Sequence, residues 1–221
     1  EDFNGKSKFW LTLAKDKNLA LHSFLQDSRA DQALSFESDN DLFFYASSQD
    51  NLYNVQILLE FYRKKAHLVS KKTNQPTSLL MSTILNKKNS EGNTPLMAAV
   101  KEGHLDCVAL LLSQPEIAIN EINNNGETAL IIAAQNIAQA QNDAQERQLQ
   151  DQETPAEFHK QLKKYEYIID AIIGLQKECD LFLKDNHENN FLHYLEGNHY
   201  LYKKYVSLFL THEEYEIVML I

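Results

Sequence analysis

The side chains in this 221-residue chain that could carry nucleophilic or metal chemistry are two cysteines and eight histidines. A thiol nucleophile needs a neighbouring base, and a zinc site on one helix needs two histidines at H-E-x-x-H spacing. His187-Glu188 is followed by His193, which does not have that spacing. The sequence also lacks a C-x-x-C pair, a G-x-S-x-G motif and a glycine-rich phosphate loop. We therefore expect no catalytic residue, no metal ligand and no cofactor, and we predict that the chain is not an enzyme.

The two thiols have separate interpretations. Cys107 stands beside Val108 in an apolar run, which places it on the inward side of a helix as a small buried residue. Cys179 follows a long stretch of helix-forming residues, so we expect it in a loop as a surface thiol without a base at a recognisable spacing. Two cysteines do not make a disulfide framework, so we expect a reducing compartment.

Composition and charge restrict the classes of partner. The net charge is −10, which repels phosphate, so we expect neither nucleic acid nor an anionic membrane as a partner. Short basic runs such as Lys71-Lys72 and Lys87-Lys88 are interpreted as solvated surface. No apolar run approaches the roughly 18 residues of a membrane span. The chain begins with Glu1 rather than Met, so we expect it to be part of a longer protein.

The elements that would position these side chains are best seen in "EGNTPLMAAVKEGHLDCVALLL" at 91–112. Thr94 can cap a helix whose first position is Pro95, and Gly103 ends it. The first helix has a narrow apolar face at Leu96, Ala99 and Val100, and the second has one at Leu105, Val108, Leu111 and Leu112. Two short helices cannot bury such faces alone, so this unit needs neighbours of the same kind.

The same unit recurs along the chain. Residues 123–136 restate 89–102, and Thr128 takes the place of Thr94; residues 185–197 restate the unit with Asn190 in that place. Residues 41–59 match 94–112 without a gap, and 9–25 are a weaker copy. The chain therefore consists of repeated helix pairs.

These segments resemble ankyrin repeats, which have a period of about 33 residues and a T-P-L-H-x-A signature. The resemblance implies an all-α fold, an ankyrin-repeat solenoid of stacked helix pairs. Its approximate repeats are 6–36, 37–70, 89–122, 123–184 and 185–210, with a C-terminal cap at 211–221. His104 and His193 stand at motif positions where ankyrin histidines fix adjacent backbone, so both are interpreted as structural.

Two steps between repeats are longer than this period. After Ala134 a stretch rich in Ala, Gln and Glu favours continued helix, and Thr154-Pro155 with Glu157 forms a capping box for a second long helix. We expect an elongated helical hairpin around 135–165 that projects beyond its neighbours. Its internal packing would join Ile137, Ala138, Ala144 and Leu149 to Phe158, Leu162 and Tyr165. A disordered polar loop is the alternative for the first half.

The other insertion, near 66–88, contains "TSLLMSTILN", which is apolar enough to form an extra helix of undetermined placement. At the C-terminus, Thr211 and Glu214 have capping-box spacing, and the apolar residues after them either cover the last repeat or begin a further one.

In the resembled family, partners bind the concave face through finger tips and variable positions of the first helices. Carried over, the partner-binding residues are Tyr45, Gln49, Glu91, Asn93, Lys101, Asn125, Glu127, Gln135, His187, Asn189 and Tyr194. Other tip and helix positions are Ser48, Ser90, Ala98, Glu102, Asn124, Ile132, Asn136, Asn186 and Glu188. Tyr45 and Tyr194 are expected to be exposed anchors, because aromatic side chains concentrate binding energy.

The resemblance implies a protein–protein interaction module that binds another protein, whose identity the sequence does not give. The oligomeric state is likewise not given by the sequence, and a monomer is favoured. The alternative is a targeting or regulatory ankyrin region of a larger enzyme whose catalytic domain lies outside these residues. The eroded repeats, the few glycines and the frequent Asn and Lys also resemble ankyrin proteins that intracellular bacteria deliver into host cells. The expected location is cytoplasmic, or the host-cell cytoplasm for such an effector.

Overall fold

The computed structural model describes residues 20–26, 42–149, 156–175 and 179–209. Within these residues the regular secondary structure is entirely helical, which confirms the all-α prediction. The helices are α2 (Ala20–Leu25), α4 (Leu42–Ser48), α5 (Leu52–Thr73), α6 (Thr77–Leu85), α7 (Pro95–Glu102), α8 (Leu105–Leu112), α9 (Ala129–Leu149), α10 (Ala156–Leu175), the 3-10 helix η1 (His193–Leu195) and α11 (His199–Val206).

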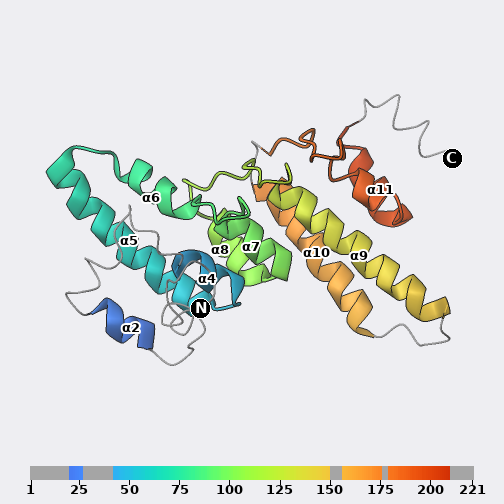
Figure 1. Ribbon diagram of the computed structural model, residues 1–221, viewed down its shortest axis with the longest axis horizontal. Coiled ribbons are helices and arrows are strands. Elements are labelled where there is room, and N and C mark those ends of the chain that lie inside the picture. The colour runs from blue at the N-terminus through green and yellow to red at the C-terminus, as the bar shows by residue number, and fades with distance from the viewer. Residues whose placement is uncertain (1–19, 27–41, 150–155, 176–178, 210–221) are drawn as a thin grey trace.

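The helices stack in two layers along the long axis of the molecule (Figure 1). Helices α4, α7 and α9 and the short η1 contact one another in chain order and form the first layer. The second layer contains α5, α8 and α10, which contact one another in the same order. Each first-layer helix also contacts the second-layer helix that follows it, so the structure is a solenoid of helix pairs.

The local signals in the α7–α8 pair act as the sequence predicts. Thr94 Oγ1 accepts a hydrogen bond of 3.3 Å from the backbone N–H of Met97, and Pro95 opens the helix. Gly103 ends α7 in the left-handed conformation at φ 69°. In the upstream pair Asp50 takes this conformation at φ 52°, although it has a Cβ. The gapless match of 41–59 to 94–112 therefore extends to the backbone conformation of the turn.

Burial on α7 is wider than the narrow apolar face that the sequence suggests. Every residue from Pro95 to Val100 is buried, because α4, α8 and α9 all pack around this helix. On α8, Cys107, Val108 and Leu111 are fully buried, but Leu105 is 36 % exposed at the start of the helix. The predicted inward position of Leu105 is therefore only partly correct.

The insertion near 66–88 contains the extra helix that the sequence suggested, and the structure shows its placement. Residues 52–73 contain neither Gly nor Pro, so α5 continues to Thr73, and Asn74 ends it at φ 60°. Helix α6 then packs back against α5. The Asn86 side chain holds this insertion to the next repeat, since it donates to the carbonyl of Glu116 (2.8 Å) and accepts from the N–H of Ala118 (2.7 Å).

The elongated hairpin is confirmed by α9 and α10, and the loop alternative for 135–149 is wrong because α9 extends to Leu149. The last residues of α9 and the first residues of α10 lie beyond α7 and α8 in Figure 1. Their interface buries Ile137, Ala140, Ala144, Tyr165, Ile168, Ile169 and Ile172, whereas Ala138, Phe158 and Leu162 are half-buried. The Leu149 side chain, the Thr154-Pro155 cap and the proposed C-terminal cap at 211–221 lie outside the described residues, as does most of the weak copy at 9–25.

A polar clamp joins the last helix to the hairpin. Lys204 Nζ lies 2.7 Å from both Glu166 Oε1 and Asp170 Oδ2, and the Tyr205 hydroxyl donates to Asp170 Oδ1 at 2.8 Å. Burial and this hydrogen bond raise the pKa of Tyr205, so the phenol remains a donor at neutral pH. Helix α11 is therefore fixed to α10 as well as to the end of its own repeat.

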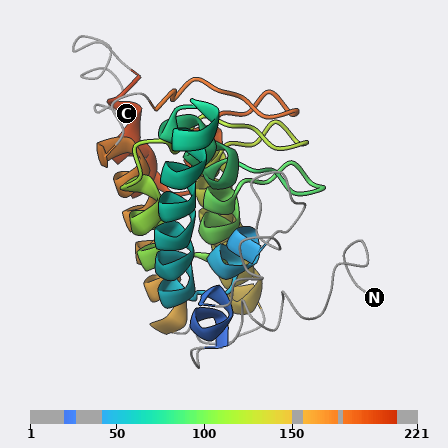
Figure 2. The ribbon, with the colours of Figure 1, turned by 90° about the vertical axis from the view of Figure 1, so that its left-hand side faces the viewer.

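Three loops project from one edge of the stack as fingers, one before each of α7, α9 and η1 (Figure 2). In each finger one side-chain oxygen accepts two backbone N–H bonds, from the residues two and four positions later. In the first finger Asn89 accepts from Glu91 (3.0 Å) and Asn93 (2.9 Å). In the second, Asn123 accepts from Asn125 and Glu127 (2.9 Å each). In the third, Asp185 accepts from His187 (2.8 Å) and Asn189 (3.1 Å). One Asn or Asp side chain within each finger therefore produces the turn that all three fingers share.

A hydrogen-bond ladder joins consecutive fingers. The backbone N–H of Asn124 donates to the Glu91 carbonyl at 3.0 Å, and that of Asn186 donates to the Asn125 carbonyl at 2.9 Å. Gly92 adopts φ 79°, and a Cβ there would lie 2.5 Å from Asn124 Oδ1 and 2.7 Å from Asn124 N. The third finger has Glu188 in the equivalent conformation, at φ 63°, with no further finger described beyond it.

We expect Leu111→Ala to lower the free energy of unfolding by about 2–5 kcal/mol, because it leaves a cavity between stacked helices. The matched change Glu91→Ala removes an exposed side chain with one hydrogen bond, from Asn93 Nδ2, and leaves its ladder carbonyl intact, so the loss should be about 1 kcal/mol or less. Urea denaturation of both variants measures the difference. Equal losses would contradict this assignment of the two helix faces.

We expect Gly92→Ala to lower the free energy of unfolding by about 2–4 kcal/mol, because the left-handed backbone is strained for alanine and the new Cβ collides with the next finger. The control is Gly174→Ala in α10, where a Cβ meets nothing within 4 Å. This control should raise stability by about 0.5–1 kcal/mol, since alanine favours helix. A stable Gly92→Ala protein in thermal melts would show that close finger stacking is not required.

Candidate partner-binding groove

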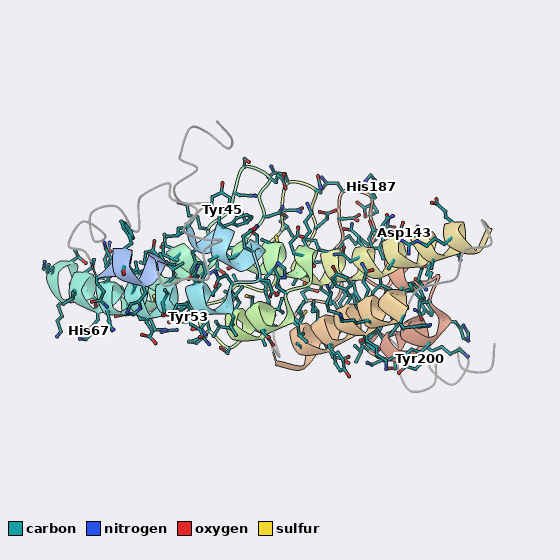
Figure 3. The ribbon with its side chains drawn as sticks, turned by 90° about the horizontal axis from the view of Figure 1, so that it is seen from below. Tyr45, Tyr53, His67, Asp143, His187 and Tyr200 are labelled. Carbon is teal, nitrogen blue, oxygen red and sulfur yellow. The ribbon has the colours of Figure 1, made fainter. Side chains whose placement is uncertain are left out.

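The fingers and the first-layer helices enclose a groove of about 560 Å³ between the first two fingers and helices α7 and α9. The side chains around it are nearly all polar, and most are amides. The lining consists of Ser90, Glu91, Asn93, Lys101, Asn123, Asn124, Asn125, Glu127, Ile132, Gln135, Asn136 and Gln139. Figure 3 shows the fingers rising on one side of the stacked helices, with His187 at the tip of the third finger.

Six of the predicted partner-binding residues line this one groove. They are Glu91, Asn93, Lys101, Asn125, Glu127 and Gln135, which come from two fingers and from α7 and α9. The other five, which are Tyr45, Gln49, His187, Asn189 and Tyr194, are not part of its lining. Their role in partner binding stays a prediction.

Two lining residues were absent from the prediction. Gln139 lies one helical turn after Gln135 and reaches the groove because α9 continues far beyond the length of an ordinary first helix. The continued helix was itself predicted, so the spacing from Gln135 to Gln139 was a usable signal. Asn123 is 92 % buried, and one of its hydrogen bonds, from Nδ2 to Asn93 Oδ1, reaches the other finger.

The carboxylates of the groove are held by amides. Glu127 accepts from Gln135 Nε2 at 2.9 Å and from Asn123 Nδ2 at 2.7 Å, and Glu91 accepts from Asn93 Nδ2 at 2.9 Å. Asn123 Nδ2 also lies 2.9 Å from Asn93 Oδ1, which connects the two fingers. The polar wall is therefore ordered by its own hydrogen bonds before any partner arrives.

Lys101 supplies a cation on the helix side of the groove. Its side chain is exposed, and no ion pair within the described residues involves it. The carbonyl of Lys101 accepts a hydrogen bond of 3.1 Å from the Tyr165 hydroxyl, which fixes the end of α7 to α10. Burial, followed by the nearby charge of Glu102, raises the pKa of Tyr165 to about 12, so this donor persists at physiological pH.

Tyr45 and Tyr194 are less exposed than the sequence suggested. Tyr45 is half-buried and packs against the core. Tyr194 is also half-buried, and its hydroxyl donates to Asp185 Oδ2. Burial acts to raise the pKa of Asp185, but three hydrogen bonds have the opposite effect. They come from the Tyr194 hydroxyl and from the backbone N–H groups of Asn189 and His187, and they hold the pKa of Asp185 below its usual value. Tyr194 therefore supports the third finger.

The remaining predicted positions differ in exposure. Asn93 is only 6 % exposed, and Ala98 and Ile132 are likewise buried, so these three present little surface to a partner. Gln49 is half-buried and donates to the carbonyl of its neighbour Ser48 at 3.2 Å. His187 is exposed at the finger tip, and Asn189 is half-buried beneath it.

The histidines at motif positions have local structural contacts. His104 Nε2 lies 3.1 Å from the carbonyl oxygen of Ser48, which joins two consecutive helix pairs. His193 Nδ1 lies 2.7 Å from Asn190 Oδ1 at the turn that begins η1. Within the described residues, no group of three or more His, Cys, Asp or Glu side chains could hold a metal ion.

Neither thiol has the surroundings of a nucleophile. Cys107 is fully buried, and burial, together with the charges of Asp50 and Asp106, raises its pKa to about 11. Cys179 was expected at the surface but is half-buried against the core, because the segment after α10 folds back onto the stack. Burial and the charge of Asp180 raise its pKa to about 11 as well. Both thiols are therefore protonated at neutral pH.

Helices able to cross a lipid bilayer are not found among the residues described by the structure. A comparison with curated proteins finds no similar sequence. The family model of ankyrin repeats (3 copies) matches residues 11–145, which is more than half of the chain. This match includes both fingers that form the groove and ends within α9. The chain belongs to the ankyrin-repeat family.

Proposed function

We propose that this chain is a protein–protein interaction module whose groove between the fingers and helices α7 and α9 binds an extended polar segment of a partner. Ankyrin repeats generally mediate protein–protein interaction and are typically non-catalytic. The observation that carries the proposal is the convergence of six residues, predicted from their repeat positions, on the lining of one groove. These residues come from two consecutive repeats, in which the equivalent positions Lys101 and Gln135 are 34 residues apart (135 − 101).

The groove chemistry suits the main chain of an extended peptide. Amide side chains both donate and accept hydrogen bonds, and they can therefore pair with peptide N–H and C=O groups. The lining contains no aromatic residue, and its one aliphatic residue, Ile132, is 5 % exposed. Affinity would come from polar contacts. Lys101 and the Glu91 and Glu127 carboxylates would determine which charges on the partner are preferred. Ordered walls reduce the entropy cost of binding.

The proposal is for binding rather than catalysis. The groove lining contains no Cys or His, and the two protonated thiols lie elsewhere. The bacterial-effector setting, a cytoplasmic location, a monomeric state and the alternative of a regulatory region in a larger enzyme stay predictions of the sequence.

The groove is tested with the double variant Lys101→Ala/Gln135→Ala in affinity purification with quantitative mass spectrometry. The matched control is Lys163→Ala/Gln161→Ala, which removes the same residue types from exposed positions on α10. Partners retained by the wild type should be retained by the control and reduced about tenfold or more by the groove variant. Thermal melts check that both variants are folded. Equal retention by the two variants would overturn the groove as the binding site.

The non-catalytic reading of Cys107 predicts slow thiol chemistry in the folded protein. At pH 8, a pKa of about 11 in place of the ordinary 9.0 leaves about a hundredfold less thiolate, and burial blocks access further. Reaction with a thiol reagent should therefore be slow in buffer for Cys107 and Cys179, and rapid for both in denaturant. Fast native labelling of Cys107 would contradict the assigned burial and reopen a nucleophilic role.

A further inference from the structure

The charge of this acidic chain is unevenly distributed. Between Glu60 and Glu91 there is no acidic residue at all, although the whole chain has a net charge of −10. The same stretch contains Arg63, Lys64, Lys65, Lys71, Lys72, Lys87 and Lys88. This basic segment coincides with the second half of α5 and with α6, which form the insertion that lengthens the helix pair.

Some of these basic side chains form contacts within the fold. Arg63 pairs with Glu116 at 3.3 Å, and Lys88 pairs with Glu121 at 2.7 Å. Lys65 lies over the Phe61 ring at 5.7 Å from its centroid. These contacts hold the insertion to the body of the repeat, and they leave the end of α5 as a separate region.

The remaining lysines of α5 share one exposed face. Lys64, His67, Leu68, Lys71 and Lys72 follow the spacing of three, four, seven and eight residues that brings side chains to the same side of a helix, and all five are exposed. No ion pair within the described part of the chain involves Lys64, Lys71 or Lys72. Together these five residues make a basic face that the described part of the chain leaves exposed.

An exposed leucine stands in the middle of this basic face. Leu68 is 56 % exposed, and Leu79 on the adjoining α6 is exposed to the same extent. Their polar neighbours do not cover them, although most large aliphatic side chains elsewhere in the stack are buried. Lysines beside an exposed leucine combine attraction to anionic headgroups with an apolar contact, and both terms strengthen binding at a lipid interface.

The basic face lies at one end of the molecule. The end of α5 and the turn into α6 form one extremity of the long axis in Figure 1, and His67 lies near that end in Figure 3. A protruding end suits a flat surface better than it suits an extended peptide, which prefers a groove. A phosphate backbone would engage the lysines, but it would leave the leucines without an apolar contact, and the face has no Phe, Tyr or Trp for base stacking.

We propose that this basic face binds an anionic lipid surface, with Lys64, Lys71 and Lys72 at the headgroup phosphates and Leu68 and Leu79 inserted between headgroups. The site is independent of the groove, so the two proposals fail separately.

The net negative charge does not prevent this contact. At physiological salt, charges more than about 8 Å apart are largely screened, so the acidic remainder of the stack has little effect at the end of α5. Glu60 is the nearest acidic residue on the same side of α5, one turn before Lys64. Net charge is a property of the whole chain, so it does not decide whether this one face binds an anionic surface.

The test is flotation of the 221-residue protein with vesicles of phosphatidylcholine alone and with vesicles that contain phosphatidylserine as well. We expect binding to the phosphatidylserine vesicles, a steep loss of that binding with added salt, and none to phosphatidylcholine alone. The variant Lys64→Gln/Lys71→Gln/Lys72→Gln should lose about a hundredfold in partitioning, because each lysine near the surface contributes independently.

Two further variants locate the contact. The control Lys163→Gln/Lys184→Gln/Lys203→Gln removes the same charge from other helices and loops and should bind as the wild type does. Leu68→Gln/Leu79→Gln should bind several-fold more weakly at unchanged salt dependence. Circular dichroism melts check that each variant is folded.

Several outcomes would overturn the proposal. These are equal binding to the two vesicle types, no binding to phosphatidylserine vesicles, an equal effect of the two lysine variants, and unchanged binding by the leucine variant. Lysine-dependent retention on polyglutamate or on duplex DNA, without vesicle binding, would assign the basic face to an acidic protein or to nucleic acid instead. Loss of vesicle binding by the groove variant alone would also overturn it.

Discussion

The close approach of consecutive fingers is the constraint on which the rest of this structure depends. The backbone N–H of one finger donates to a carbonyl of the finger before it, at 3.0 Å and 2.9 Å for the two described steps. This distance is attainable only because the residue facing the next finger, Gly92 or Gly126, has no Cβ and adopts a positive φ. The ladder sets the spacing of the units, and helices α7 and α9 pack at that spacing.

The insertions are tolerated because a solenoid requires each unit only to match its neighbours. Both lie at the ends of helices, away from the fingers: one lengthens α5 and adds α6, and the other lengthens α9 and α10. Each is fastened by polar contacts at its base, through Asn86 in the first case and through the Lys204 clamp in the second. The ladder is therefore undisturbed while the molecule gains surface beyond an ordinary repeat.

The two proposed surfaces use different chemistry at different places. The groove is ordered by amides that hold Glu91 and Glu127, and it lies between fingers that belong to adjoining repeats. The basic face belongs to the insertion at one end of the stack. Arg63 and Lys88 form the ion pairs that hold this insertion to the next repeat, and the lysines of the basic face take no part in these pairs. A module with both surfaces could hold a protein partner close to a membrane.

The sequence by itself determined the repeated helix pair, its caps and turns, and the long hairpin. These features depend on residues within a few positions of each other, such as Thr94 with Met97 or Asn89 with Asn93, so a short window of sequence contains their cause. It also identified six lining residues of the groove, because a repeat places equivalent positions on one face.

Exposure was decided only by the tertiary structure. Asn93 is buried by Asn123, and Tyr194 is engaged by Asp185, so neither is a free contact residue despite its repeat position. Cys179 is half-buried because the chain after α10 returns to the core. Net charge did not indicate where the basic residues lie, whereas the structure shows that Lys64, Lys71 and Lys72 share one exposed side of α5 and form no ion pair with any described residue. Contacts between residues that are apart in the sequence, by 9 positions for Tyr194 and Asp185 and by 30 for Asn123 and Asn93, determine burial and pairing, and a short sequence window does not contain them.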